Sequence, residues 1–191
     1  MQSVPLDLPQ NATKEFTATV LCLRRSTSPG PFIYLQAVHS GKADPNGLVA
    51  QQYLGTLPFT VTQLCHLAKG IPFDAIVSPP TRFTDLILPY RSGVHAQVPD
   101  ALDLTDRFTR SGNVFSGEDA TVDNLLQSLD YRPSGEEPAY RHLAIIDDIL
   151  RSGTTALTIV RKLREVGLPT DGQVTIICPL FLDNASTPGQ T

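Results

Sequence analysis

The chain has 191 residues, of which 41% are hydrophobic and 18% charged, a balance typical of a folded globular protein rather than a disordered one. The formal net charge of -4 gives no basic excess that would indicate duplex nucleic acid as a partner. No apolar run approaches the roughly 20 residues that span a bilayer, and the first residues lack the pattern of a signal peptide. We therefore expect a cytoplasmic protein without membrane contact, folded as a single domain over residues 1–191.

The first part of the chain predicts a β-hairpin followed by an interrupted helix. Residues 14–23 and 32–38 are rich in β-branched and aromatic side chains, which favour strands, and the Pro-Gly-Pro sequence at 29–31 indicates a tight turn between them. These features predict a hairpin outside the main sheet. Residues 48–69 predict two short helices, separated near Gly55 and Pro58.

The middle of the chain carries weaker signals. Residues 73–77 predict a short apolar strand that ends at the Ser-Pro-Pro sequence 78–80. Residues 81–118 contain many turn-forming and charged side chains and one apolar patch at residues 86–88, and this pattern assigns no particular element to them. Residues 119–130 predict a helix, because their apolar side chains recur at helical spacing.

The clearest unit is a strand, a loop, a helix and a second strand. Residues 142–146 are almost wholly apolar, as expected of a strand that is buried on both faces of a parallel sheet. Residues 154–166 predict an amphipathic helix, and residues 174–182 predict another buried strand. This βαβ pattern predicts an α/β fold with an open, mainly parallel sheet and helices on both faces. Ligands of such sheets bind beyond the carboxyl ends of the strands.

The loop inside this unit combines two kinds of polar group. Asp147 and Asp148 directly follow a buried strand, where carboxylates need hydrogen-bond donors. Residues 151–155 then open a helix, whose N-terminal N–H groups attract an anion, and three hydroxyl side chains add further donors. A sugar phosphate suits both halves of the loop. In the alternative interpretation, the same residues only cap a turn and a helix, which stabilises a protein by about 1 kcal/mol.

The sequence of residues 143–155, LAIIDDILRSGTT, resembles the phosphoribosyl-pyrophosphate signature of the type I phosphoribosyltransferases. The resemblance implies that Asp147 and Asp148 contact the ribose hydroxyls and take part in catalysis. It also implies a loop that binds the 5-phosphate, formed by Arg151, Ser152, Gly153, Thr154 and Thr155. At the position of Arg151, the family more often has a small hydroxyl residue.

Two earlier segments also resemble parts of this family. Residues 73–82 (FDAIVSPPTR) are similar to its pyrophosphate loop, above all in the branch related to bacterial DNA-uptake competence factors, which implies substrate contacts from Pro80, Thr81 and Arg82. The two prolines remove backbone N–H donors, so a stiff turn is the alternative. Residues 103–118 resemble its mobile catalytic loop in position, with Arg107 and Arg110 as the candidate catalytic cations, or form an ordinary solvated loop.

The resemblance implies transfer of a phosphoribosyl group from phosphoribosyl pyrophosphate (PRPP) to a nucleobase or related amine. Mg²⁺ is the implied cofactor, held through PRPP and indirectly by Asp147 and Asp148, since hard oxygen ligands suit it. The alternative is a non-catalytic protein that senses PRPP or a nucleotide. The resemblance further implies a hood in residues 14–60 and a core in residues 61–182, and it is compatible with a homodimer. Residues 183–191 have the composition of a flexible tail.

Overall fold

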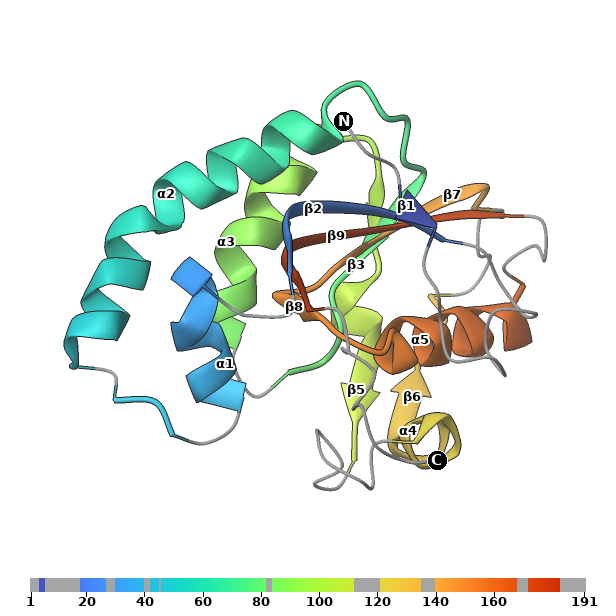
Figure 1. The fold of residues 1–191 in the computed structure, drawn as a ribbon. Coiled ribbons are helices and arrows are strands. Elements are labelled where there is room, and N and C mark those ends of the chain that lie inside the picture. Colours follow the sequence, from blue (N-terminus) through green and yellow to red (C-terminus); the bar gives the residue numbers. More distant parts are fainter. Residues whose placement is uncertain are drawn as a thin grey trace, which may run out of the picture.

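A mainly parallel sheet with helices on both faces forms the centre of the molecule (Figure 1). The computed structural model describes residues 4–5, 18–26, 30–39, 42–44, 46–81, 84–111, 121–134, 140–167 and 172–182. The strand order is β1-β2-β9-β7-β3-β4, and β8 also pairs with β9. The strands are β1 (Val4–Pro5), β2 (Ala18–Ser26), β3 (Ala75–Val77), β4 (Leu102–Asp103), β7 (His142–Ile146), β8 (Ile149–Leu150) and β9 (Gln173–Leu182). All pairs in this sheet are parallel except β1 with β2, so the predicted α/β sheet is confirmed.

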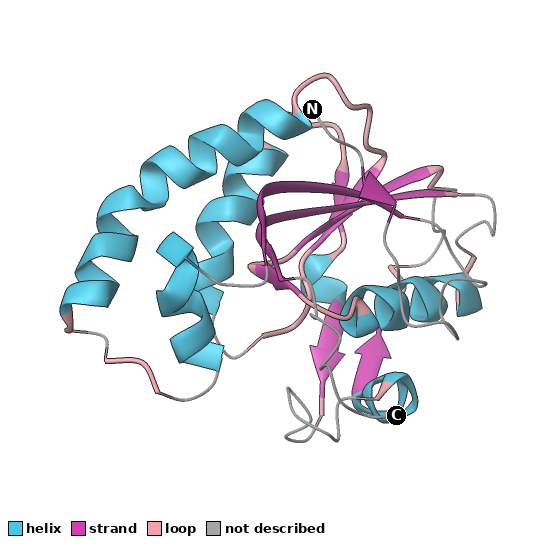
Figure 2. Ribbon diagram, viewed as in Figure 1, coloured by secondary structure: helices cyan, strands magenta, loops and turns pink. Residues whose placement is uncertain are grey.

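Helices cover both faces of the sheet (Figure 2). The helices are α1 (Ile33–His39), α2 (Leu48–Ala68), α3 (Thr84–His95), α4 (Val122–Ser128) and α5 (Thr154–Glu165). Alternate residues of β7 point to opposite faces, as the two-residue period of a strand requires. Leu143 and Ile145 pack in one core with α5, whereas Ala144 and Ile146 pack in a second core with α2 and α3.

The predicted strand–helix–strand unit is confirmed. β7, α5 and β9 begin and end within one residue of the predicted bounds, and β7 pairs in parallel with β9. From Val174 to Leu182 every side chain of β9 is buried, because β9 has a strand on each side and helices on each face. The predicted strand at residues 73–77 is also present, as the shorter β3.

The predicted N-terminal hairpin is wrong. The first strand, β2, belongs to the main sheet and pairs in parallel with β9 rather than with residues 32–38. Those residues form a short 3-10 turn (Gly30–Phe32) and the helix α1. The buried side chains Tyr34, Leu35 and Val38 fall at helical spacing, so packing against α2 and the end of β9 outweighs the strand preference of their residue types.

The predicted break near Gly55 and Pro58 is also wrong, since α2 is a single helix of 21 residues. Both residues lie on its exposed face, where water can reach the carbonyl group that proline leaves without a donor. The opposite face buries Ala50, Tyr53, Thr60, Leu64 and Ala68, and this packing holds the helix together. None of the described helices is both long enough and apolar enough to cross a membrane.

Residues 81–118 are more regular than the sequence predicts. They contain α3, β4, a 3-10 turn (Thr105–Arg107) and the strand β5 (Phe108–Arg110), which pairs antiparallel with β6 (Leu129–Tyr131) in a separate ribbon. The helix predicted at 119–130 is present as the shorter α4, which ends at Ser128 because the next residues form β6. Residues 112–118 of the predicted mobile loop and the predicted flexible tail, residues 183–191, lie outside the described residues.

Candidate functional site

The strands β3 and β7 are neighbours whose onward connections leave in opposite directions. From β3 the chain passes through α3 to β4 on one side, and from β7 it passes through α5 to β9 on the other. Such a switch in strand order leaves a crevice at the carboxyl ends of the two strands. Ser78 follows β3 and Asp147 follows β7, so the fold brings the two sequence-predicted segments to the same edge of the sheet.

The two acidic residues occupy different surroundings. The backbone N–H of Asp147 donates to the carbonyl of Ile177 at 3.0 Å, which fixes the exit of β7 against β9. One carboxylate oxygen of Asp147 accepts the N–H of Asp148 at 2.9 Å. Asp147 is half-buried, whereas Asp148 is only 4% exposed. The outer carboxylate is therefore the more accessible to a ligand.

A cation from the β5–β6 ribbon interacts electrostatically with Asp147. Burial lowers the pKa of the Arg110 guanidinium, and the nearby charge of Asp147 opposes that change. Arg110, a candidate from the sequence, thus lies within the electrostatic range of the first acid. Arg107 has a different partner. Its Nη1 donates a hydrogen bond to the hydroxyl of Tyr131, on β6 of this ribbon, at 3.5 Å.

The predicted phosphate loop ends in the N-terminus of α5. Gly153 has a left-handed backbone (φ 72°) and is buried, and α5 starts at the next residue. The hydroxyls of Ser152 and Thr154 are 2.7 Å apart, and Thr155 is half-buried beside them in sequence. Arg151 is exposed at the start of the loop. A 12-residue helix therefore begins six residues after Asp148, and the N–H of its first residue, Thr154, donates to the Ser152 hydroxyl at 3.4 Å.

The loop after β3 has few backbone donors for a ligand. The N–H of Ser78 donates to the hydroxyl of Thr105 at 2.9 Å, and Pro79 and Pro80 have no N–H. Ser78 itself is fully buried, and its hydroxyl has no hydrogen-bond partner among the described residues. Thr81 is half-buried, and Arg82 lies outside the described residues.

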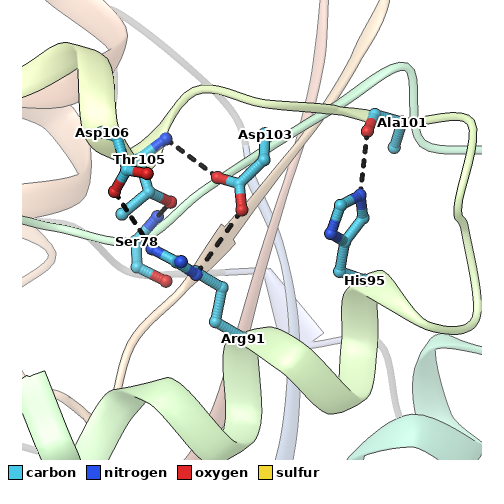
Figure 3. A network of polar contacts seen from close by, with 7 residues as sticks. All are labelled: Ser78, Arg91, His95, Ala101, Asp103, Thr105 and Asp106. Atoms are coloured by element: carbon cyan, nitrogen blue, oxygen red, sulfur yellow. Dashed lines mark hydrogen bonds and ion pairs between the residues drawn. The ribbon is translucent and has the colours of Figure 1, made fainter.

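A polar network fixes this loop to β4 (Figure 3). Arg91 reaches from α3 to the carboxylates of Asp103 at 3.5 Å and Asp106 at 3.6 Å. Asp103 also accepts the N–H of Thr105 at 2.9 Å, and Thr105 holds Ser78. The network joins residues far apart in the sequence, so no local pattern could have revealed it.

Two buried tyrosines also lie near the site. The hydroxyls of Tyr53 on α2 and Tyr90 on α3 are 2.6 Å apart, and the residues are 1% and 0% exposed. Burial, with a smaller contribution from the charge of nearby Asp148, raises the pKa of both phenols, that of Tyr90 to about 12. The position of Tyr53 near the site could not be predicted from the sequence, because a tyrosine on an apolar helix face looks the same as any other buried aromatic residue.

Asp74 serves the fold at the other end of the sheet. Its carboxylate accepts the N–H groups of Arg141 and His142, both at 2.8 Å, where β3 and β7 begin. Within the described part of the chain, no group of three or more His, Cys, Asp or Glu side chains could hold a metal ion. The acidic pair could contribute to a Mg²⁺ site only together with ligand oxygens, which is a usual arrangement for this ion.

Comparison with solved structures finds an adenine phosphoribosyltransferase from Thermoanaerobacter pseudethanolicus, with a TM-score of 0.46 and 14% sequence identity over 70% of this chain and 84% of that chain. A hypoxanthine phosphoribosyltransferase from Staphylococcus aureus is similar with a TM-score of 0.35 and 15% identity in its tetragonal crystal form, over 66% of this chain and 61% of that chain. Its orthorhombic form has the same score and identity, over 71% of this chain and 68% of that chain. No protein-family model and no curated protein matches this sequence.

Proposed function

We propose that the protein binds a 5-phosphoribosyl group and transfers it from PRPP to a nitrogen atom of a nucleobase or related amine. One observation supports this best: an acidic pair and the N-terminus of α5 meet at the carboxyl end of β7, over the switch between β3 and β7. The LAIIDDILRSGTT sequence supplies acceptors for ribose hydroxyls followed at once by donors for a phosphate.

In the proposed reaction, the bond between C1 of the ribose and the pyrophosphate oxygen breaks, and its electron pair leaves with pyrophosphate. The acceptor nitrogen forms the new bond to C1 and releases its proton. The transition state carries positive charge on the sugar, which the carboxylates of Asp147 and Asp148 stabilise. Ser152, Gly153, Thr154 and Thr155 hold the 5-phosphate, so that the sugar is oriented for attack.

The cations at the site complement the charge of the leaving group. Arg110 lies within electrostatic range of Asp147, which suits a role beside pyrophosphate, and we assign Arg107, Arg151 and Arg82 supporting roles toward the phosphates. Mg²⁺, bound through the oxygens of PRPP, would neutralise part of the pyrophosphate charge. Pro80 and Thr81 would line the pyrophosphate side of the crevice.

A second function, sensing of PRPP or a nucleotide without catalysis, is favoured by the loop after β3. Its Ser78 N–H is already bonded to Thr105, and Pro79 and Pro80 supply no N–H. A site that binds the ribose 5-phosphate half strongly and the pyrophosphate half weakly would suit a sensor.

The double substitution of Asp147→Asn and Asp148→Asn tests the assignment of the pair. Each change removes a charged acceptor, so we expect PRPP affinity to fall at least about 100-fold. The measurement is calorimetric titration with PRPP and magnesium. The matched control is Asp123→Asn with Asp130→Asn, two exposed acids outside the crevice, which removes the same charge and should leave affinity unchanged. Equal affinity of both double variants and the wild type would refute the role of the pair.

Pyrophosphate release then separates the two functions. Release that requires both PRPP and an added nucleobase identifies the transferase. Binding of PRPP without any release, across a panel of nucleobases and amines, identifies the sensor.

A further inference from the structure

Two of the three cysteines lie opposite each other in the central sheet. Cys22 on β2 is the register partner of Cys178 on β9, and the two strands run side by side in parallel (Figure 1). The third cysteine, Cys65, lies on the helix α2. The proposed reaction uses none of these thiols, so the pairing of Cys22 with Cys178 has no role in it.

The two thiol side chains lie on the same face of the sheet. Cys178 belongs to the core that contains α5, and Cys22 packs against that core. Their chain neighbours Leu21 and Ile177 belong to the core on the opposite face, as the two-residue period of a strand requires. Neighbouring strands are about 4.7–4.9 Å apart, which lies within the Cα separation of about 4.4–6.8 Å found across disulfides. The backbone therefore holds the two thiols at a spacing that a disulfide can bridge.

The two thiols differ in their access to water. Cys178 is fully buried, whereas Cys22 is half-buried, as is Cys65. Burial raises the pKa of the Cys178 thiol well above its ordinary value, and the nearby charges of Cys22 and Asp147 contribute to the same change. Because an oxidant reacts with an accessible thiolate, Cys22 is the member of the pair that it meets first. Cys178 then lies beside it as the second thiol.

Cys178 also lies against the segment that begins with the acidic pair. At the exit of β7, the carbonyl of Ile177 accepts the N–H of Asp147 at 3.0 Å. The next residue of β9 is Cys178, and the backbone N–H of Leu150 in β8 donates a hydrogen bond to its thiol. Two consecutive residues of β9 therefore hold the two ends of the segment 147–150.

We propose that Cys22 and Cys178 form a reversible disulfide within the chain on exposure to a hydroperoxide, and that this bond loosens residues 147–150. Bonding to Cys22 draws the sulfur of Cys178 toward β2 and away from the N–H of Leu150. One of the two contacts that hold the segment to β9 is then lost, while the bond from Asp147 to Ile177 remains. The oxidation state of the two thiols thus controls the order of the acidic segment.

The hydroperoxide alone balances the reaction. The sulfur of Cys22 attacks one peroxide oxygen, the O–O bond breaks, and Cys22 becomes a sulfenic acid while water or an alcohol leaves. The sulfur of Cys178 then attacks the sulfur of Cys22, and the S–O bond breaks. The departing hydroxide takes the thiol proton of Cys178 and leaves as water. The two thiols lose two electrons, which the peroxide gains, and a small dithiol restores both thiols by exchange.

Mass spectrometry of the full chain tests for the bond. The protein is treated with hydrogen peroxide, and the remaining thiols are then alkylated under denaturing conditions. The wild type should lose about 2 Da, carry an alkyl group on Cys65 alone, and give a digest in which the peptides of Cys22 and Cys178 are linked. Cys65→Ala is the matched control at a second half-buried cysteine and should still form the bond, whereas Cys22→Ala should not. Oxidation that leaves Cys22 and Cys178 unlinked, or that links either of them to Cys65, overturns the proposal.

Amide hydrogen exchange of the same samples tests the effect on the acidic segment. Residues 147–150 should exchange at least about 10-fold faster in the oxidised wild type than in the reduced one, and dithiothreitol should restore the slow exchange. Peroxide-treated Cys22→Ala should show no change, which separates the bond from other oxidation. A bond that forms without faster exchange in this segment also overturns the proposal.

The consequence for ligand binding rests on the proposed function, under which a looser acidic segment binds PRPP less tightly. Neither the mass measurement nor the exchange measurement uses PRPP. Failure of the disulfide therefore leaves the proposed function standing, and failure of PRPP binding leaves the disulfide standing.

Discussion

The two tyrosine hydroxyls between α2 and α3 show how single polar groups are placed beside the acidic pair. Each phenol is almost completely buried, and the 2.6 Å hydrogen bond between them satisfies one donor that would otherwise be lost in the core. A hydrogen bond depends on the orientation of its two groups, so this one restrains the position of α2 relative to α3 more than apolar contacts alone would. Both hydroxyls must stay protonated, because both are buried and the carboxylate of Asp148 lies nearby.

This requirement predicts a loss of stability in alkali. An unfolded tyrosine ionises near its ordinary pKa of 10.0, whereas folded Tyr90 has a pKa of about 12 and that of Tyr53 is raised further. Between these values the unfolded chain binds fewer protons than the folded one, so the free energy of unfolding falls as pH rises above about 10. Urea unfolding at pH 7 and at about pH 11 measures the change.

Phenylalanine variants identify the source of this loss. Tyr53→Phe with Tyr90→Phe removes both hydroxyls, so it should be nearly neutral at pH 7 and should reduce the alkaline loss. Tyr90→Phe alone should cost about 1–3 kcal/mol at pH 7, because the hydroxyl of Tyr53 loses its partner. Tyr34→Phe is the control within the same cluster, since its ring packs 5.4 Å from that of Tyr53. An alkaline loss that the double variant leaves intact would show that other groups cause it.

At the scale of elements, the contact between α2 and α3 depends on the small size of Gly93. A Cβ atom added there would lie 2.6 Å from Cγ1 of Val61 and 2.9 Å from Sγ of Cys65, both on α2. Gly93→Ala should therefore destabilise the protein by about 1–3 kcal/mol through overpacking, although alanine favours a helix by about 1 kcal/mol. Urea unfolding of dilute protein measures the effect. Gly55→Ala is the matched control, because a Cβ atom there would have no atom of the described residues within 4 Å, and it should stabilise the protein by about 0.5–1 kcal/mol.

The elements that the sequence predicts correctly are those in which local pattern and tertiary packing agree. β7, α5 and β9 are strongly apolar or amphipathic over their whole length, so their neighbours could not change their structure. Residues 32–38 and the helix α3 are the opposite case. α3 contains Pro89 and Gly93, yet Ile87, Tyr90 and Val94 recur at helical spacing and are buried against α2. Packing against α2 and against the sheet makes that helix stable.

The same distinction applies to the site. Asp147, Asp148 and residues 151–155 are contiguous, so the acidic pair and the helix N-terminus could be found in the sequence. The bond from Ser78 to Thr105 and the pairing of Tyr53 with Tyr90 join separate segments, and neither has a local pattern. From the sequence, Arg110 could be identified only as a positively charged residue in a predicted loop. Its nearness to Asp147 follows from the ribbon of β5 and β6, which the sequence did not predict.

At the scale of the whole molecule, β9 holds the sheet together. It pairs with β2 on one side, with β7 on the other and with β8 beyond the end of β7. A chain truncated after residue 172 should therefore lose both cores, since side chains of β9 belong to each. We expect it to show no cooperative thermal transition by near-ultraviolet circular dichroism. Truncation after residue 182 keeps β9 and is the control, and a cooperative transition in the shorter chain would contradict the central role of β9.

The pairing of β2 with β9 also has a consequence for biosynthesis. Val20 lies opposite Ile176, so β2 is made 156 residues before the strand with which it pairs. While the ribosome is still translating the residues between them, β2 has β1 as its sheet neighbour but lacks β9, and it leaves apolar side chains exposed to other nascent chains. Closing so long a loop is also slow. The sheet can therefore assemble only after residues 173–182 have emerged, and until then the nascent chain depends on chaperones or on rapid completion to avoid aggregation.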